Sequence, residues 1–184
     1  MRISNDYYLI VDLEATCSDR GEIPHREMEI IEIGAVMQSS RTFEIEAEFQ
    51  TCVFPVRHSD LTDFCTQLTG ITQQEVDQAP PFADALAAFQ QWMRPFPDAL
   101  FCSWGDFDRN QFRQDCEHHG LDYPFPPEHM NIKAEFARSL NLRREVGFAK
   151  ALHRLGMKFE GSHHRGLDDA KNIARIARRL CIGC

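Results

Sequence analysis

Apolar runs and alternating stretches divide the first third of the chain into three strand segments. Residues 7–11 form an uninterrupted apolar run, which predicts a buried strand. Residues 28–37 predict a second strand, whose start also allows a helical turn. Residues 42–49 alternate between apolar and polar side chains, as a strand with one solvated face does. Short connections between the three segments favour an antiparallel meander.

Helical spacing dominates the rest of the chain, with two further strands. Residues 59–65 begin with an N-cap candidate, and Thr72-Gln73-Gln74-Glu75 matches a capping box at the start of a helix to residue 77. A core stripe at spacings of three and four and a terminating Pro95 predict a helix over residues 82–93. Later segments are predicted as strands over 99–104 and 129–132, and as helices over 109–118, 133–140, 147–155 and 166–181. This order predicts an α/β fold with a mixed sheet.

Length and composition favour an ordinary globular domain. The chain has 184 residues, enough for one domain over 1–184 with a sizeable core. It has no apolar run near the roughly 20 residues of a membrane span and no signal-peptide pattern, so a cytoplasmic protein is expected. The seven cysteines are scattered, which favours reduced thiols. Cys181 and Cys184 have C-x-x-C spacing, interpreted as the fraying end of the last helix, with redox chemistry as the alternative.

Charge is distributed unevenly along the chain. Residues 1–132 hold 8 Lys and Arg against 23 Asp and Glu, a net charge of −15, whereas residues 133–184 hold 12 against 5, a net charge of +7. The overall charge of −8 disfavours nucleic acid as a partner, but an acidic region beside a basic one suits a site that cleaves phosphodiesters. A solvated basic helix face is the alternative interpretation.

Candidate chemistry begins with Asp12 and Glu14 at the end of the first strand. Side chains alternate along a strand, so both carboxylates project from the same face. Two ionised carboxylates at a buried strand end repel each other, and a hard divalent cation such as Mg²⁺ or Mn²⁺ compensates them. The alternative is an exposed strand end with solvated acids. The sequence Asp12-Leu13-Glu14-Ala15-Thr16-Cys17 also lacks the glycine-rich loop that a dinucleotide-binding domain requires.

Two more acidic clusters stand at predicted helix starts. Asp106 and Asp108 follow the fourth predicted strand, where capping of the helix is the competing explanation. His164 precedes Asp169 by five positions, and Asp169 lies in the first turn of the last helix, where compensation of the helix dipole competes with a chemical role.

Together these motifs resemble the DEDDh family of 3′–5′ exonucleases, the DnaQ-like branch of the ribonuclease H fold. The family pattern of Asp-x-Glu, a later aspartate and His-x-x-x-x-Asp is matched in order. A closer resemblance links the chain to the histone-mRNA and RNA-interference exonuclease subfamily, which includes KapD-type proteins. It rests on residues 12–17, on Phe64-Cys65 with Leu68-Thr69-Gly70-Ile71-Thr72, on Asn131-Ile132-Lys133 and on residues 164–175.

The resemblance implies a ribonuclease H-like mixed sheet, antiparallel in its first three strands and then parallel, flanked by helices. It also implies two Mg²⁺ or Mn²⁺ ions held by Asp12, Glu14, Asp108 and Asp169, with Asp106 as the alternative to Asp108. His164 would accept a proton from the attacking water, and the product would be a nucleoside 5′-monophosphate. Glu14 and the backbone near Ala15 and Thr16 would hold the terminal 3′-hydroxyl. The terminal base would stack in an apolar slot of Leu68, Ile71 and Phe107, for which core packing is the alternative.

Single-stranded RNA or DNA 3′ ends are the expected partners, with Lys and Arg from 143 to 179 on upstream phosphates. The subfamily favours RNA over DNA. A protein partner for targeting is allowed, and the sequence leaves the oligomeric state open. Two other functions compete: a binding module of the same fold without catalysis, and a phosphodiesterase for very short oligonucleotides.

Overall fold

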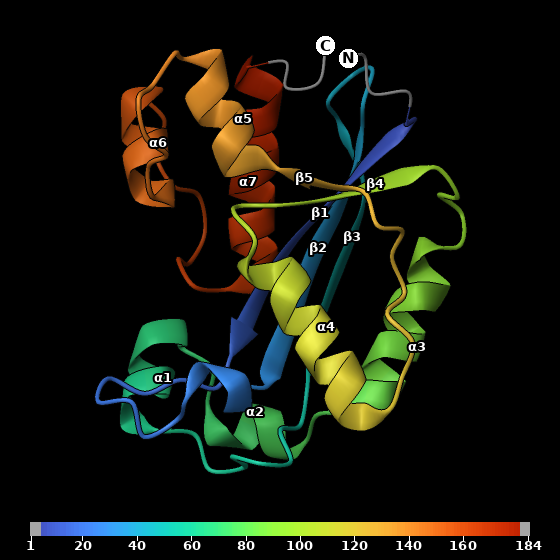
Figure 1. The fold of residues 1–184 in the computed structure, drawn as a ribbon, viewed down its shortest axis with the longest axis vertical. Helices are drawn as coiled ribbons and strands as arrows, with labels where there is room; N and C mark the ends of the chain where they lie inside the picture. Colours follow the sequence, from blue (N-terminus) through green and yellow to red (C-terminus); the bar gives the residue numbers. More distant parts are fainter. Residues whose placement is uncertain (1–4, 181–184) are drawn as a thin grey trace.

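The computed structural model describes residues 5–180, and its centre is a five-stranded sheet with the order β3-β2-β1-β4-β5 (Figure 1). The strands are β1 (Tyr7–Ala15), β2 (Ile30–Ser39), β3 (Ile45–Cys52), β4 (Ala99–Ser103) and β5 (His129–Asn131). β1, β2 and β3 pair antiparallel, whereas β4 pairs parallel to β1 and β5 parallel to β4. This topology confirms the predicted mixed sheet.

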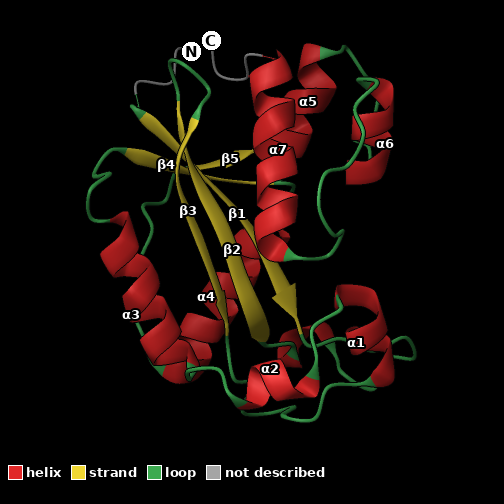
Figure 2. Cartoon of the chain, turned by 180° about the vertical axis from the view of Figure 1, so that it is seen from behind, coloured by secondary structure: helices red, strands yellow, loops and turns green. Residues whose placement is uncertain are grey.

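Helices cover both faces of the sheet. In Figure 1, α4 crosses in front of the sheet and α7 runs behind it, and Figure 2 shows α7 from its own side. The helices are η1 (His25–Glu27, a 3-10 turn), α1 (Asp63–Thr69), α2 (Gln73–Asp77), α3 (Phe82–Met93), α4 (Phe107–His119), α5 (Ile132–Ser139), α6 (Phe148–Arg154) and α7 (Gly166–Leu180). Within residues 5–180, none of these helices is long and apolar enough to cross a lipid bilayer.

Alternation along β1 separates two cores. Leu9, Val11 and Leu13 pack against α3 and α4 on one face. Tyr8 and Ile10 pack on the opposite face, in the cluster that contains the apolar stripe of α7. Because side chains alternate, Asp12 and Glu14 continue the face that α7 covers.

The α1–α2 segment lies at the end of the sheet towards which β1 runs (Figure 1). It has its own small core of Ile31, Cys65, Ile71 and Val76, separate from the two main clusters. The predicted capping box is confirmed: Thr72 accepts from the Glu75 backbone N–H, and the Glu75 side chain accepts from the Thr72 N–H.

Two element starts differ from the sequence prediction by three residues or more. The third strand begins at Ile45 rather than at residue 42, because Phe43 adopts a left-handed φ of 57° in the preceding turn. The side-chain amide of Gln38 donates to the Phe43 carbonyl and fixes that turn. The helix expected from residue 59 begins at Asp63, capped by the Thr62 side chain. The prediction for Cys181 and Cys184 falls outside the described residues.

A pair of glycines brings the start of α7 onto the sheet. A Cβ atom on Gly34 would lie 1.9 Å from the carbonyl carbon of Gly166, and one on Gly166 would lie 2.7 Å from the Asp12 carbonyl oxygen. Neither position therefore tolerates a side chain without separating helix from sheet. This backbone contact sets the first turn of α7, with Asp169, beside Asp12 on β1.

Candidate active site

Three carboxylates converge where β1 meets the first turn of α7. Oxygen atoms of Asp12, Glu14 and Asp169 lie within 4.8 Å of one another. Glu14 is 7% exposed and Asp169 is 3% exposed, although carboxylates are rarely buried without a partner. The predicted meeting of these distant positions is therefore present in the structure.

The structure separates the two candidate aspartates near α4. Asp108 is buried, and its Oδ1 accepts a hydrogen bond of 2.9 Å from the Leu13 backbone N–H, which ties it to β1 between Asp12 and Glu14. Asp106 is exposed and pairs with Arg109 at 3.1 Å. The geometry favours Asp108 as the fourth member of the cluster.

Burial raises the pKa of every carboxyl group in this cluster, and the neighbouring acids add to the shift. Burial, followed by the charges of Asp108 and Asp169, raises the pKa of Asp12 well above its usual value. Burial and the neighbouring acids raise the pKa of Glu14 to about 8. Burial raises the pKa of Asp108 to about 7, although the hydrogen bond from the Leu13 N–H opposes the shift. Burial also raises the pKa of Asp169, to about 6. Part of this cluster therefore stays protonated at neutral pH. A bound cation would replace those protons and compensate the negative charges of the carboxylates.

One carboxylate oxygen of the cluster is left available to a cation. Asp169 Oδ2 accepts from the His164 N–H at 2.7 Å, but the buried Oδ1 has no hydrogen-bond partner among residues 5–180. A buried unpaired carboxylate oxygen is costly, and a metal ion is a partner that relieves this cost. The all-oxygen ligand set suits the hard cations Mg²⁺ and Mn²⁺.

His164 stands in the loop that leads into α7. Its backbone is left-handed, with φ of 62°, an uncommon conformation that is enriched at functional sites. The ring lies 4.1 Å, centroid to centroid, from that of His163. Burial and the neighbouring His163 lower the pKa of His164, so its imidazole is neutral at physiological pH and able to accept a proton.

A cavity of about 300 Å³ opens beside the carboxylates. Leu68 and Phe107, two of the predicted stacking residues, line it and remain 37% and 43% exposed. Exposed apolar side chains at the mouth of a polar cavity suit a planar ligand. Asp12, Glu14, Ala15, Asp108, His164 and Asp169 also line this cavity.

Two predicted substrate residues are not brought to the cavity. Ile71 is fully buried in the small core of the α1–α2 segment, so the alternative of core packing describes it. Thr16 is also buried, and it bonds to Glu29 instead: its N–H donates to the Glu29 carbonyl at 2.8 Å, and its Oγ1 accepts from the Glu29 N–H.

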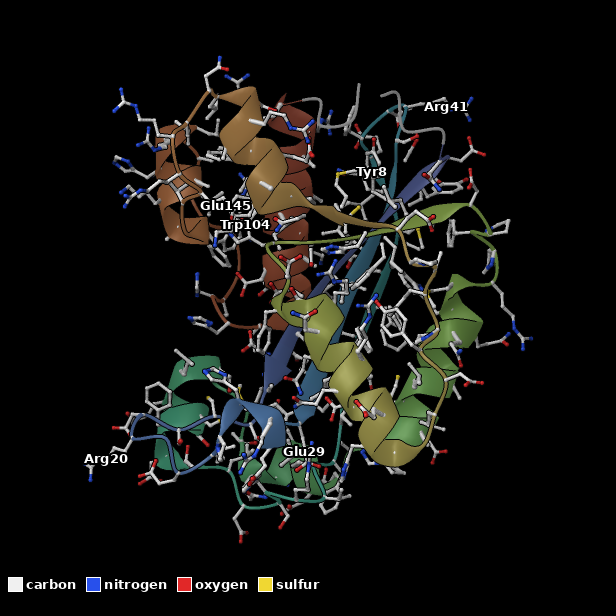
Figure 3. All side chains as sticks on the ribbon, in the orientation of Figure 1. Tyr8, Arg20, Glu29, Arg41, Trp104 and Glu145 are labelled. Atoms are coloured by element: carbon white, nitrogen blue, oxygen red, sulfur yellow. The ribbon has the colours of Figure 1, made fainter. Side chains whose placement is uncertain are left out.

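Other lining residues escaped sequence reasoning. Trp104, labelled in Figure 3, directly follows β4. Its ring packs against Phe136 of α5 and Phe148 of α6. Its position directly after the fourth strand, shortly before Asp108, was the sequence feature from which its place at the cavity could have been predicted. The remaining unpredicted lining residues are Leu13, Cys17, Met28, Phe148 and His163, which only the tertiary fold brings together.

The acidic first part of the chain and the basic last part form ion pairs with each other in the folded structure, so their charges partly cancel. Basic side chains of α7 pair with acids from the other half of the chain, such as Lys171 with Glu48 at 2.7 Å and Arg178 with Glu44 at 2.8 Å. Arg175 pairs with Glu160 at 2.7 Å. The prediction that Lys and Arg from 143 to 179 contact nucleic-acid phosphates remains a prediction.

The known proteins that this chain resembles are exonucleases. The RNase T model, described as exonuclease, matches residues 9–177. The 3′-5′ exoribonuclease 1 of Homo sapiens is 39% identical over 189 residues, covering 97% of this chain and 54% of that protein. The chain thus spans about half the length of this relative.

Two solved structures extend the similarity to the fold. One is the nuclease domain of 3′hExo, a DEDDh family member, bound to rAMP; it matches with a TM-score of 0.85 and 35% identity, over 98% of this chain and 94% of that one. The other shows 3′-end specific recognition of a histone mRNA stem-loop by a 3′-exonuclease. It matches with a TM-score of 0.88 and 34% identity, over 98% of this chain and 65% of that one.

Proposed function

Because the chain belongs to the DEDDh branch of the RNase T exonuclease family, we propose that it is a metal-dependent 3′–5′ exonuclease that acts on single-stranded nucleic acid. It prefers RNA to DNA and releases nucleoside 5′-monophosphates. The observation that carries this proposal is the convergence of Asp12, Glu14 and Asp169 around a buried, unpartnered carboxylate oxygen, with Asp108 and His164 on the same cavity.

Asp12, Glu14, Asp108 and Asp169 would hold two divalent ions, Mg²⁺ or Mn²⁺. When bound, such ions supply Lewis acidity and charge neutralisation for phosphodiester hydrolysis. His164 accepts the proton of the attacking water, because its lowered pKa keeps the ring neutral. Its backbone hydrogen bond to Asp169 holds it at the cluster.

The cavity suits one terminal nucleotide. Its volume of about 300 Å³ lies at the lower end of small-ligand pockets, roughly 300–1,000 Å³. Leu68 and Phe107 offer apolar faces to the base, and stacking tolerates every base. Glu14 and Ala15 also line the cavity, and the 3′-hydroxyl would bind there.

The preference for RNA is supported by the relatives. The human relative carries the name exoribonuclease, one similar structure contains rAMP, and another concerns an RNA stem-loop. These are properties of those proteins, and the preference is proposed for this chain by similarity.

The test is a panel of 5′-labelled RNA and DNA oligonucleotides with Mg²⁺ or Mn²⁺, with single-stranded, duplex and dinucleotide forms. We expect single-stranded RNA to shorten stepwise from its 3′ end with release of mononucleotides, and Asp12→Ala to abolish this release. A 3′-phosphate should block the reaction. Cleavage confined to dinucleotides would instead indicate a phosphodiesterase for very short substrates, and a fully active Asp12→Ala protein would contradict the proposal.

A further inference from the structure

We propose that Arg165 is a positioning residue, which holds His164 and Asp169 in place by bridging two carboxylates, Glu32 of β2 and Glu75 of α2. This inference rests on the proposed function for its kinetic consequence. The bridge itself is a property of the fold: the guanidinium lies 2.9 Å from Glu32 Oε1 and 3.2 Å from Glu75 Oε1.

Glu32 is a fifth carboxylate beside the catalytic cluster, but its hydrogen bonds give it a different role. It lies directly opposite Glu14 in the β1–β2 pairing and is fully buried. Its oxygens accept from the Gly166 N–H at 2.6 Å and from the Gln50 side-chain amide at 2.8 Å, besides the ion pair with Arg165. Glu32 is therefore satisfied by protein donors, whereas Asp169 Oδ1 has no such donor in the described part of the chain.

The anchored segment contains both functional residues. Arg165 lies between His164 and Gly166, and its carbonyl oxygen accepts from the Asp169 N–H at 2.9 Å. The His164 N–H donates back to Asp169 Oδ2. Because His164 sits in an unfavourable left-handed conformation, the surrounding contacts must impose it, and the residue that directly follows it, Arg165, is anchored to the buried Glu32 carboxylate.

The second arm connects this segment to the cavity wall. Glu75 closes the capping box of α2 by accepting from Thr72, and it accepts from Arg165 with its other oxygen. Through Gly70, α2 joins α1, which carries Leu68 at the mouth of the cavity. Arg165 thus links the wall that would contact the base to the loop that carries the proposed proton acceptor.

The competing role for Arg165 is a direct phosphate contact. Its side chain is 24% exposed, and its two terminal nitrogens already face Glu32 and Glu75. A buried ion pair broken on one side leaves an uncompensated charge, so recruitment of this guanidinium by a phosphate would be unfavourable. The geometry favours positioning.

The kinetic test compares Arg165→Ala with Arg57→Ala on a single-stranded RNA. Arg57 is a matched control, because it is 22% exposed and also bridges two carboxylates, Glu29 and Asp115. We expect kcat of Arg165→Ala to fall about 10–100-fold with KM within about twofold, as when a support of a ligand or catalytic group is removed. Arg57→Ala should keep kcat within about twofold. Arg165→Lys keeps the positive charge but loses the two-pronged guanidinium that reaches both Glu32 and Glu75, so we expect its kcat to be partly restored.

Amide hydrogen exchange tests the positioning without requiring activity. Exchange of the 163–169 segment should rise about tenfold or more in Arg165→Ala and stay unchanged in Arg57→Ala, because only the first change frees this segment. If the wild-type protein has no nuclease activity, the proposed function fails, while exchange still decides the positioning role. A raised KM with unchanged kcat would assign Arg165 to phosphate binding, and unchanged kinetics and exchange would overturn the proposal. If Arg165→Ala does not fold, the same readouts on Arg165→Lys decide it.

Discussion

Asp106 and Asp108 show how two residues with the same side chain, two positions apart, acquire different environments. Asp108 is buried and bound to the backbone of β1, whereas Asp106 is exposed and paired with Arg109. The sequence motif alone leaves both as candidates, since an aspartate at a helix start is also a common cap. Burial and the direction of the side chain distinguish them.

We therefore expect Asp108→Asn to lose about 10²–10³-fold in kcat, equivalent to about 3–4 kcal/mol of transition-state stabilisation. Asp106→Asn is the matched control, and its kcat should stay within about threefold of the wild-type value. Asp106 is exposed and pairs with Arg109 outside the acidic cluster, and Arg109 keeps its contact with His129 in this variant. The measurement is the rate of mononucleotide release at saturating Mg²⁺. Equal losses in both variants would remove Asp108 from the proposed ligand set.

The neighbouring histidines allow a similar comparison. Both line the cavity, but only His164 has its backbone N–H bound to Asp169. Loss of a proton acceptor typically costs about 10²–10⁴-fold, so His164→Ala should lower kcat by this amount. His163→Ala should reduce kcat much less. If His163→Ala is the more damaging change in a single-turnover assay, the proton acceptor has been assigned to the wrong ring.

The contact between α7 and the β1–β2 pair brings the site together. Gly34→Ala would force the carbonyl carbon of Gly166 away from β2, and overpacking of this kind costs about 1–3 kcal/mol or more. Because Asp169 moves with the helix, activity should fall together with stability. Gly147→Ala is the control, since an added Cβ there meets no atom within 4 Å. Thermal unfolding and kcat measured on both variants check this expectation, and a Gly34→Ala protein with normal Tm and kcat would contradict it.

Most elements could be predicted from periodicity and capping, because the signals are local. The stripe of α3, the Thr72–Glu75 capping box and the strand bearing Asp12 are examples. The contact of Gly34 with Gly166 and the pairing of Glu32 with Arg165 could not, because each joins residues more than 130 positions apart. The site acids were recognisable from their motif order, whereas the cavity walls depend on tertiary packing. Ile71 illustrates the limit: the family resemblance left it as either a stacking residue or a core residue, and the fold buries it in the core.

Across the molecule, the raised pKa values of the acidic cluster couple stability to pH and to cations. Between about pH 4 and 8 the native carboxyl groups of Glu14, Asp108 and Asp169 retain protons that the unfolded chain has already lost. Unfolding then releases protons, so the free energy of unfolding of the metal-free protein falls as pH rises. A bound divalent cation replaces those protons and reverses the effect.

We expect the metal-free protein to lose about 3–6 kcal/mol of stability between pH 5.5 and 8, since one pKa unit corresponds to about 1.4 kcal/mol and all three carboxyl groups lose protons in this range. Added Mg²⁺ should restore this loss at pH 8. Urea unfolding at several pH values, with and without Mg²⁺, measures both effects. The control is Glu14→Gln with Asp169→Asn, which should flatten the pH dependence and remove the response to Mg²⁺. A metal-free stability that rises over this range would contradict the assigned shifts.

The α1–α2 segment packs around Ile31, Cys65, Ile71 and Val76, apart from the cores that hold the sheet together. One rim of the cavity beside the carboxylates is therefore supported by a small hydrophobic core of its own. Substitutions in that small core would widen or narrow the entrance of the cavity, and so change which modified nucleotides fit the proposed site. The central sheet and its acidic cluster would keep their structure.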